Sequence, residues 1–202
     1  TPCCVRPRSQ GWGSLTISAL AYFRVSFHAA APINSFLPHQ MLNPKQLYTF
    51  IIAPVIAHLN LDGLAARRLV LGTALTESGL IALDQYDSGP LVIGPALGLW
   101  QMERATHDDI WVNFLAYHSS LRATIEDYLI PMDRWEQLVG NLYYGCAMCR
   151  VHYRRVLAPL PNADDLIGLA RYWKTYYNTP KGKGTPNNFI NAAAMILNPD
   201  FM

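Results

Sequence analysis

Residues 64–80 read L-A-A-R-R-L-V-L-G-T-A-L-T-E-S-G-L, and this stretch decides the fold class. Its leucines recur at helical spacing, at Leu64, Leu69, Leu71 and Leu75. The pattern predicts a helix from Leu64 to Ser78, with Gly79 at the position where a glycine commonly ends one. Glu77 closes this apolar run, where a carboxyl group is either a solvated helix end or an acid held in an apolar pocket.

Helical signals also fill the rest of the chain from Met41 onward. Asn43 and Pro44 match an N-cap followed by proline at the first helical position, which predicts a helix towards His58 with a kink at Pro54. Further helices are expected from Thr106 to about Leu115, from Ser119 or Ser120 to about Ile130, from Asp133 to about Leu157, from Asn162–Asp165 to about Tyr177, and at Asn187–Leu197. Residues 80–98 carry several Gly and Pro residues and are expected to form a long loop. Neither strand alternation nor an internal repeat is found, so the sequence predicts one mainly α-helical domain over residues 41–202.

Residues 1–40 differ from the rest of the chain in composition, with three arginines and no acidic residue. A basic start followed by the apolar stretch Leu15–Phe23 faintly resembles a signal peptide. However, Arg24 interrupts the stretch, which is too short to span a membrane. We expect an irregular N-terminal extension, a processing segment or an artefact of upstream translation, and no membrane-spanning segment.

The composition indicates one globular domain and argues against nucleic-acid binding. The chain has 202 residues, of which 51% are hydrophobic and 15% charged, which is enough for a sizeable core. Its net charge of +2 disappears once the arginines of residues 1–40 are set aside. A nucleic-acid binder usually concentrates basic residues on its folded part. The one short cluster, Arg150, Arg154 and Arg155, is interpreted as a solvated helix face.

Cys146 and Cys149 form a C-x-x-C motif, which can indicate zinc binding or redox chemistry. The motif lies inside a run with helical character, and no second ligand pair stands at zinc spacing. His152 is the one nearby candidate ligand. The sequence therefore favours buried, reduced cysteines, and no metal or cofactor is expected.

Four short segments combine polar and aromatic residues in a way that suggests chemistry. They are Glu77-Ser78, G-P-A-L-G-L-W-Q-M at residues 94–102, N-L-Y-Y-G at residues 141–145, and Y-Y-N-T-P-K-G-K-G-T at residues 176–185. Their order resembles the lytic transglycosylases of the soluble-lytic (SLT, goose-type-lysozyme-like) family. That family shows an E-S pair, a G-L-M-Q-like segment, an N-I-x-x-G helix start and an A-Y-N-A-G-like segment. The resemblance covers roughly Leu64–Thr185. The residues of the second and fourth segments resemble the versions found in bacteriophage virion proteins.

The resemblance implies a lysozyme-like (SLT-type) helical fold that cleaves the MurNAc-GlcNAc bond of peptidoglycan with Glu77 as the single catalytic acid. The acid must deliver a proton to the leaving oxygen, and burial among apolar side chains would keep it protonated near neutral pH. In this family the substrate's own N-acetyl group assists, and the muramyl 6-hydroxyl closes a 1,6-anhydro ring. The resemblance therefore implies neither a second carboxylate nor a cofactor.

Substrate contacts are implied for the residues that align with the motifs, namely Ser78, Gly98, Leu99, Trp100, Gln101, Tyr176, Tyr177 and Asn178. Ser78 would hydrogen-bond near the acid or the substrate's acyl group, and the Gln101 amide would contact the N-acetyl group. Tyr177 would orient Glu77 through a hydrogen bond. Trp100 and Tyr176 offer flat faces for sugar rings, with core packing as the alternative for Trp100. We assign Trp111 and Trp135 to core packing.

The sequence leaves alternatives open for both chemistry and context. W-Q-M-E-R stands where family members often have M-Q-I-M-P, which introduces Glu103 and Arg104. Asp84 and Asp87 could supply a second carboxylate if the enzyme is a lysozyme-type hydrolase. The resemblance implies a phage virion component that opens the cell wall in the bacterial periplasm, with peptidoglycan strands and other virion or tail proteins as partners. The alternatives are a catalytically weak structural module of a virion or tail, and a cellular periplasmic enzyme exported by residues 1–40.

Overall fold

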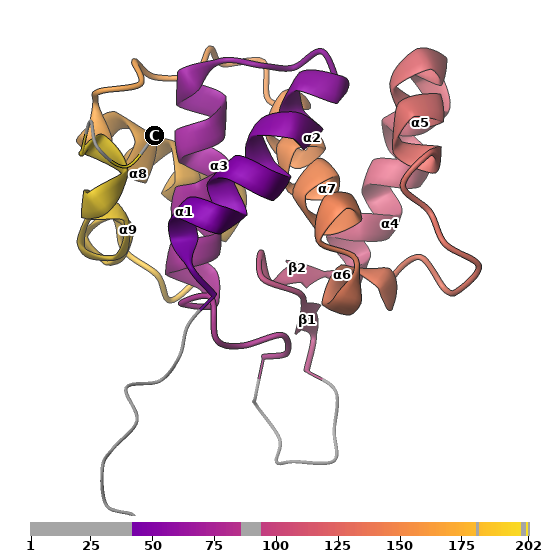
Figure 1. The fold of residues 1–202 in the computed structure, drawn as a ribbon, viewed down its shortest axis with the longest axis horizontal. Helices are drawn as coiled ribbons and strands as arrows, with labels where there is room; N and C mark the ends of the chain where they lie inside the picture. The colour runs from indigo at the N-terminus through magenta and orange to yellow at the C-terminus, as the bar shows by residue number, and fades with distance from the viewer. Residues whose placement is uncertain (1–41, 86–93, 181, 199–200, 202) are drawn as a thin grey trace, which may run out of the picture. The chain divides into compact units, whose positions relative to one another are not determined.

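The computed structural model describes residues 42–85, 94–180, 182–198 and 201, all within the unit Leu37–Met202. These residues are mainly helical, which confirms the predicted mainly α class (Figure 1). The α-helices are α1 (Pro44–Leu47), α2 (Ala53–His58), α3 (Leu64–Glu77), α4 (Arg104–Asn113), α5 (Ser119–Glu126), α6 (Gln137–Gly140), α7 (Leu142–Arg154), α8 (Leu166–Trp173) and α9 (Pro186–Ala193). The extension expected over residues 1–40 lies outside the described residues.

The apolar stretch that opened the sequence analysis forms α3, as predicted. The helix ends at Glu77, Ser78 is its C-cap, and Gly79 leaves it with a positive φ of 57°. Most side chains from Ala66 to Leu75 are buried, because α9, α8 and α7 all pack against this helix (Figure 1). α3 therefore runs through the core and delivers Glu77 at its end.

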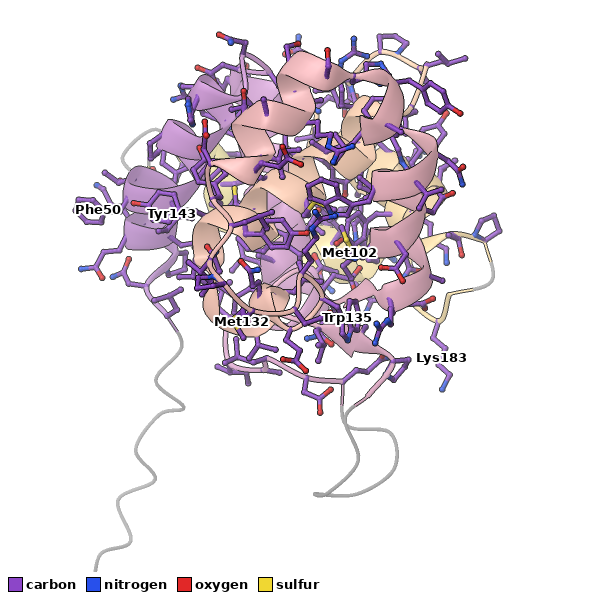
Figure 2. The ribbon with its side chains drawn as sticks, turned by 90° about the vertical axis from the view of Figure 1, so that its right-hand side faces the viewer. Phe50, Met102, Met132, Trp135, Tyr143 and Lys183 are labelled. Atoms are coloured by element: carbon purple, nitrogen blue, oxygen red, sulfur yellow. The ribbon has the colours of Figure 1, made fainter. Side chains whose placement is uncertain are left out.

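The first predicted helix forms, but a π-helical turn, η1 (Tyr48–Ile52), separates α1 from α2. Asn43 caps α1 as expected, accepting the amides of Lys45 and Gln46. Pro54 has no N–H to donate to the carbonyl of Phe50, four residues earlier. The hydroxyl of Tyr143 donates to this carbonyl at 3.3 Å, and Figure 2 shows the two side chains together on one face. The carbonyl that Pro54 cannot serve thus accepts a hydrogen bond from α7 instead.

The long helix predicted from Asp133 to about Leu157 is wrong, because the chain breaks into α6 and α7. Asn141 interrupts it with a φ of −103° and a ψ of 88°, outside the helical region. Its side-chain oxygen accepts the amide of Tyr144, and its side-chain amide donates to the carbonyl of Tyr128. Asn141 therefore acts as the N-cap of α7, while Asp133 caps only a turn before α6.

The remaining helices match the predicted ones with shifted ends. α4 begins at Arg104, before Thr106, because Glu103 is its N-cap, and α5 already ends at Glu126. Asp165 caps α8, which passes into a π-helical turn, η3 (Lys174–Asn178). Thr185 and Asn188 form a capping box at the start of α9, before a 3₁₀ turn, η4 (Ala194–Leu197).

A short hairpin missing from the sequence prediction begins within residues 80–98, which were expected to form a loop. Strands β1 (Ala96–Leu97) and β2 (Met102–Glu103) pair antiparallel, with Leu97 opposite Met102. Strands of two residues carry no alternation that a sequence pattern can reveal. Gly98 begins the turn with a φ of 76°, and a Cβ added there would lie 2.1 Å from the carbonyl oxygen of Leu138. The turn therefore depends on glycine at this position.

Gly98→Ala should lower the free energy of unfolding by about 3 kcal/mol or more, because it combines left-handed backbone with a clash against backbone. Gly140→Ala is the matched control, since a Cβ at Gly140 meets no atom within 4 Å. It should change stability by no more than about 1 kcal/mol. Urea unfolding of both variants measures the difference, and equal stabilities would contradict the account of the turn.

No helix among the described residues has both the length and the apolar character needed to cross a bilayer.

Candidate active site

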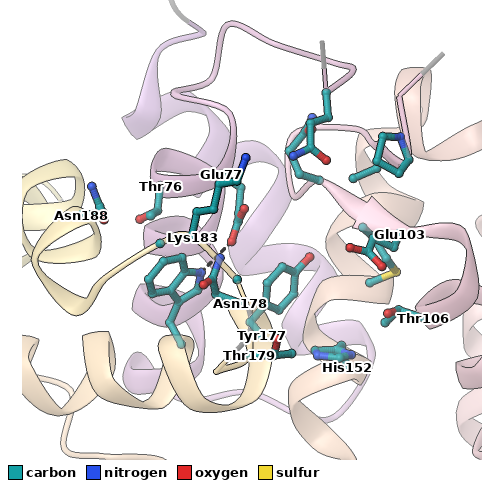
Figure 3. A pocket seen from close by; sticks show the side chains of 18 residues that line it. Thr76, Glu77, Glu103, Thr106, His152, Tyr177, Asn178, Thr179, Lys183 and Asn188 are labelled. Atoms are coloured by element: carbon teal, nitrogen blue, oxygen red, sulfur yellow. Dashed lines mark hydrogen bonds between the residues drawn. The ribbon is translucent and has the colours of Figure 1, made fainter. Parts of the chain in front are cut away.

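A cavity of about 780 Å³ opens where the end of α3, the hairpin, η3 and the loop after η3 meet (Figure 3). His152 of α7, Trp173 of α8 and Asn188 of α9 complete its walls, so the fold brings together residues far apart in the sequence. The lining residues used below are Glu77, Gln101, Glu103, His152, Trp173, Tyr177, Asn178 and Lys183. Glu77, Gln101, Tyr177 and Asn178 are among those that the sequence predicted.

Glu77 lies at the end of the buried helix with its carboxyl group largely removed from water. Burial raises its pKa from 4.5 to about 7, because the charged form loses hydration. The indole N–H of Trp173 donates to Glu77 Oε1 at 2.9 Å, and this bond opposes the rise because it favours the carboxylate. Within the described residues, no other group donates to this carboxyl group. Glu77 is thus present in comparable amounts as acid and as base near neutral pH.

The structure gives Tyr177 a different partner from the predicted one. Its hydroxyl donates to the backbone carbonyl of Trp100 at 2.6 Å, and the hydrogen bond to Glu77 comes from Trp173 instead. Tyr177 still lines the cavity beside Glu77, and its buried hydroxyl has a pKa well above 10. Its role is to connect η3 to the hairpin turn, which holds two walls of the cavity together.

Trp100 belongs to the core and does not form a flat face in the cavity. Its side chain is 2% exposed, and its indole N–H donates to the carbonyl of Val70 in α3 at 3.0 Å. The ring lies against Gly145 of α7, where an added Cβ would come within 3.1 Å of it. The alternative of core packing is therefore the observed one for Trp100. Trp111 and Trp135 are also buried, as predicted.

Gln101 and Asn178 line the cavity, and both side chains are held by their own loops. The Gln101 amide donates to the carbonyl of Gly98 at 2.8 Å, which leaves its side-chain oxygen without a donor among the described residues. Asn178 accepts from the Lys174 ammonium group at 2.8 Å. The same ammonium group donates to the carbonyls of Thr179 and Gly182, both at 2.8 Å. Lys174 thereby fixes the loop that forms one side of the cavity.

Besides Trp100, four residues predicted to contact a ligand are not among those that line the cavity. Ser78 is buried, and its hydroxyl donates to the carbonyl of Ala74 and accepts from the amide of Leu80. Gly98 and Leu99 lie in the hairpin turn, where Leu99 is buried. Tyr176 faces a second cavity of about 380 Å³, with its ring 4.6 Å from that of Tyr172. These positions support the walls and do not face Glu77.

A second carboxylate in the cavity comes from a residue that the sequence did not assign to this role. Asp84 accepts the amide of Gly94 at 2.8 Å and is not among the lining residues, while Asp87 lies outside the described residues. Glu103, at the end of β2, lines the cavity and is drawn across it from Glu77 in Figure 3. The sequence Q-M-E at residues 101–103 could have indicated this role, because it places Glu103 two residues after Gln101, in the hairpin.

His152 and the two cysteines take no part in proton transfer at neutral pH. The Nε2 atom of His152 lies 2.8 Å from the Tyr176 carbonyl, and Arg155 donates to its Nδ1 atom at 3.2 Å. Burial lowers the pKa of His152 to about 4, so the ring is neutral. Cys146 and Cys149 are free, fully buried thiols. Within the described residues, no group of three or more His, Cys, Asp or Glu could hold a metal ion.

The arrangement therefore places Glu77, a carboxyl group that can give and take a proton near neutral pH, in a polar cavity of about 780 Å³. This is the requirement for cleaving an acetal bond by general acid catalysis. Comparison with known proteins finds no matching family model, no similar curated protein and no similar solved structure.

Proposed function

We propose that this protein is a lytic transglycosylase with a lysozyme-like fold, which cleaves peptidoglycan between MurNAc and GlcNAc. The observation that supports this most strongly is Glu77, which has a pKa near 7 and shares its cavity with Gln101, Tyr177 and Asn178. These residues lie up to a hundred positions apart, yet they belong to the motifs that resemble the family.

The proposed reaction uses Glu77 twice. Protonated Glu77 gives its proton to the bridging oxygen as the bond from that oxygen to C1 of MurNAc breaks. The N-acetyl group of the same sugar stabilises the developing charge at C1. The Glu77 carboxylate then takes the proton of the C6 hydroxyl while the C6 oxygen forms a bond to C1. This bond closes the 1,6-anhydro ring. A pKa near 7 suits both steps, because neither form of Glu77 is rare at neutral pH.

The proposed setting is a phage particle that opens the cell wall locally and acts in the bacterial periplasm. The sequences of the second and fourth motifs, residues 94–102 and 176–185, support this setting. Virion or tail proteins would be the partners. The alternative, a catalytically weak structural module of the virion, predicts that the wild-type protein clears no peptidoglycan in a zymogram.

A second candidate function is a lysozyme-type hydrolase, and Glu103 is the observation that favours it. Glu103 lines the same cavity as Glu77, so it could take a proton from a water molecule that attacks C1. This reaction would give reducing MurNAc ends. In the proposed transglycosylase, Glu103 would at most contact hydroxyl groups of the substrate.

Mass spectrometry of digested peptidoglycan should find 1,6-anhydro-MurNAc ends for both the wild type and Glu103→Gln. The variant should change the rate by less than about tenfold, because removal of a required general base costs roughly 100-fold or more. Reducing ends from the wild type, together with a loss of about 100-fold in Glu103→Gln, would instead establish the hydrolase.

A further inference from the structure

Trp173 contacts the carboxyl group of Glu77 in a way that determines where that group can carry a proton. The indole N–H donates to Oε1 at 2.9 Å, and both side chains line the cavity in which Figure 3 labels Glu77. We propose that Trp173 is the positioning residue that places the catalytic proton of Glu77 on Oε2, an inference that rests on the proposed role of Glu77.

The chemistry of the indole group decides which oxygen of Glu77 stays unprotonated. An indole N–H can only donate, so the oxygen that faces it must present a lone pair in both protonation states of the carboxyl group. In a protonated carboxyl group the carbonyl oxygen is the better acceptor, and Oε1 takes that role. The proton is therefore carried by Oε2.

The surroundings of Oε2 decide what its proton faces. Nothing among the described residues donates to this oxygen, yet it is not one of the buried polar atoms without a partner. Oε2 is consequently accessible, and because Glu77 lines the cavity, the accessible side is the cavity. The proton on Oε2 thus faces the space where a leaving oxygen would lie.

The packing around Trp173 decides how rigidly its indole group is held. Its side chain is 1% exposed, and its ring lies 5.7 Å from that of Phe189, which packs closely against Gly72 of α3. Gly184 also lies so close that an added Cβ would come within 2.6 Å of the indole. α3, α8 and α9 therefore fix both the donor and the acceptor of the hydrogen bond.

Few charges compete with Trp173 for control of Glu77. The titratable groups nearest to it on the packed elements are Cys149 and Tyr153 of α7 and Tyr177 of η3. Burial holds the pKa of each well above its usual value, so all are neutral at pH 7. Three further titratable groups line the cavity, namely Glu103, Lys183 and the neutral His152. Trp173 is the one hydrogen-bond donor to Glu77 within the described residues.

The test replaces Trp173 with benzothienylalanine by site-specific incorporation, since this residue keeps the ring shape and exchanges N–H for sulfur. Because the lost bond favours the carboxylate, the pKa of Glu77 should rise above its wild-type value. The high-pH limb of kcat should move to higher pH by the same amount. With the carboxyl group free to rotate, kcat on the plateau should fall roughly 10- to 100-fold while KM changes little. Trp173→Phe should change the pKa of Glu77, the high-pH limb and kcat in the same directions.

Trp111→Phe is the matched control, because the Trp111 indole N–H donates to the Tyr144 hydroxyl in another part of the core. It should leave the pH limb unmoved. NMR titration of the Glu77 carboxyl carbon, assigned with Glu77→Gln, measures the pKa without any activity. An unchanged pKa in the folded benzothienylalanine protein overturns the proposal for Trp173. A raised pKa in the variant, together with a wild-type protein that cleaves no peptidoglycan, supports the hydrogen-bond role and overturns the proposed function instead.

Discussion

Glu77→Gln should abolish peptidoglycan cleavage, with a loss of roughly 100- to 10,000-fold. Gln has nearly the same shape as protonated Glu, and its side-chain oxygen can still accept the indole N–H of Trp173. The cavity should therefore keep its form and its affinity for glycan strands. Only the proton that the leaving oxygen needs would be missing. Zymograms and release of soluble fragments from purified peptidoglycan measure the effect.

Glu126→Gln provides the control for this experiment. Glu126 lies on α5 in an exposed i,i+4 pair with Arg122, and it is not among the residues that line the cavity. Its substitution should leave cleavage unchanged, because an exposed pair of this kind contributes little to stability. Equal cleavage by the wild type and Glu77→Gln would remove Glu77 from the mechanism.

The contribution of Glu77 to the free energy of unfolding should fall by as much as about 3 kcal/mol as the pH rises from 4.5 to 7. In the unfolded chain Glu77 releases its proton near pH 4.5, whereas the folded protein holds it to about pH 7. Below pH 4.5 the group is protonated in both states and contributes nothing. Between pH 4.5 and 7 this carboxyl group binds more protons in the folded state than in the unfolded state, so its contribution to stability declines with pH. Above pH 7 the full penalty remains.

Glu77→Gln isolates this contribution, because an amide does not titrate. The variant should match the wild type in unfolding free energy at pH 4 and exceed it at pH 8. Urea unfolding at a series of pH values gives both curves, and other titrating groups cancel in their difference. If the two curves run parallel, Glu77 ionises in the folded protein as easily as in water.

The helical class could be predicted because it depends on local patterns. The apolar spacing of Leu64–Leu75 and the caps at Asn43 and Asp165 act over a few residues, and the structure contains them. The break at Asn141 could not be predicted from periodicity. Its side-chain amide is held by the carbonyl of Tyr128, a contact that exists only once the preceding segment has folded back. The hairpin at 96–103 was missed because strands of two residues carry no readable alternation.

Several residues that line the cavity could be predicted from the sequence, but their hydrogen bonds could not. Motif order brought Glu77, Gln101, Tyr177 and Asn178 together, but not the donor to Glu77. A signal for Trp173 was present, because it stands four residues before Tyr177 and so lies on the same helical face. The partners of Trp100 were beyond the sequence, since Val70 is thirty positions away and offers only a backbone carbonyl.

The Lys174 ammonium group has a consequence for binding thermodynamics. Its three N–H groups all donate to oxygens at the end of η3 and in the loop after it, so the ammonium group is surrounded by oxygens as a bound metal cation is by its ligands. A loop organised by an internal charge keeps its shape before any ligand arrives. A glycan strand entering the cavity would then meet a wall whose conformational entropy was already lost during folding, and more of its contact energy would remain as affinity.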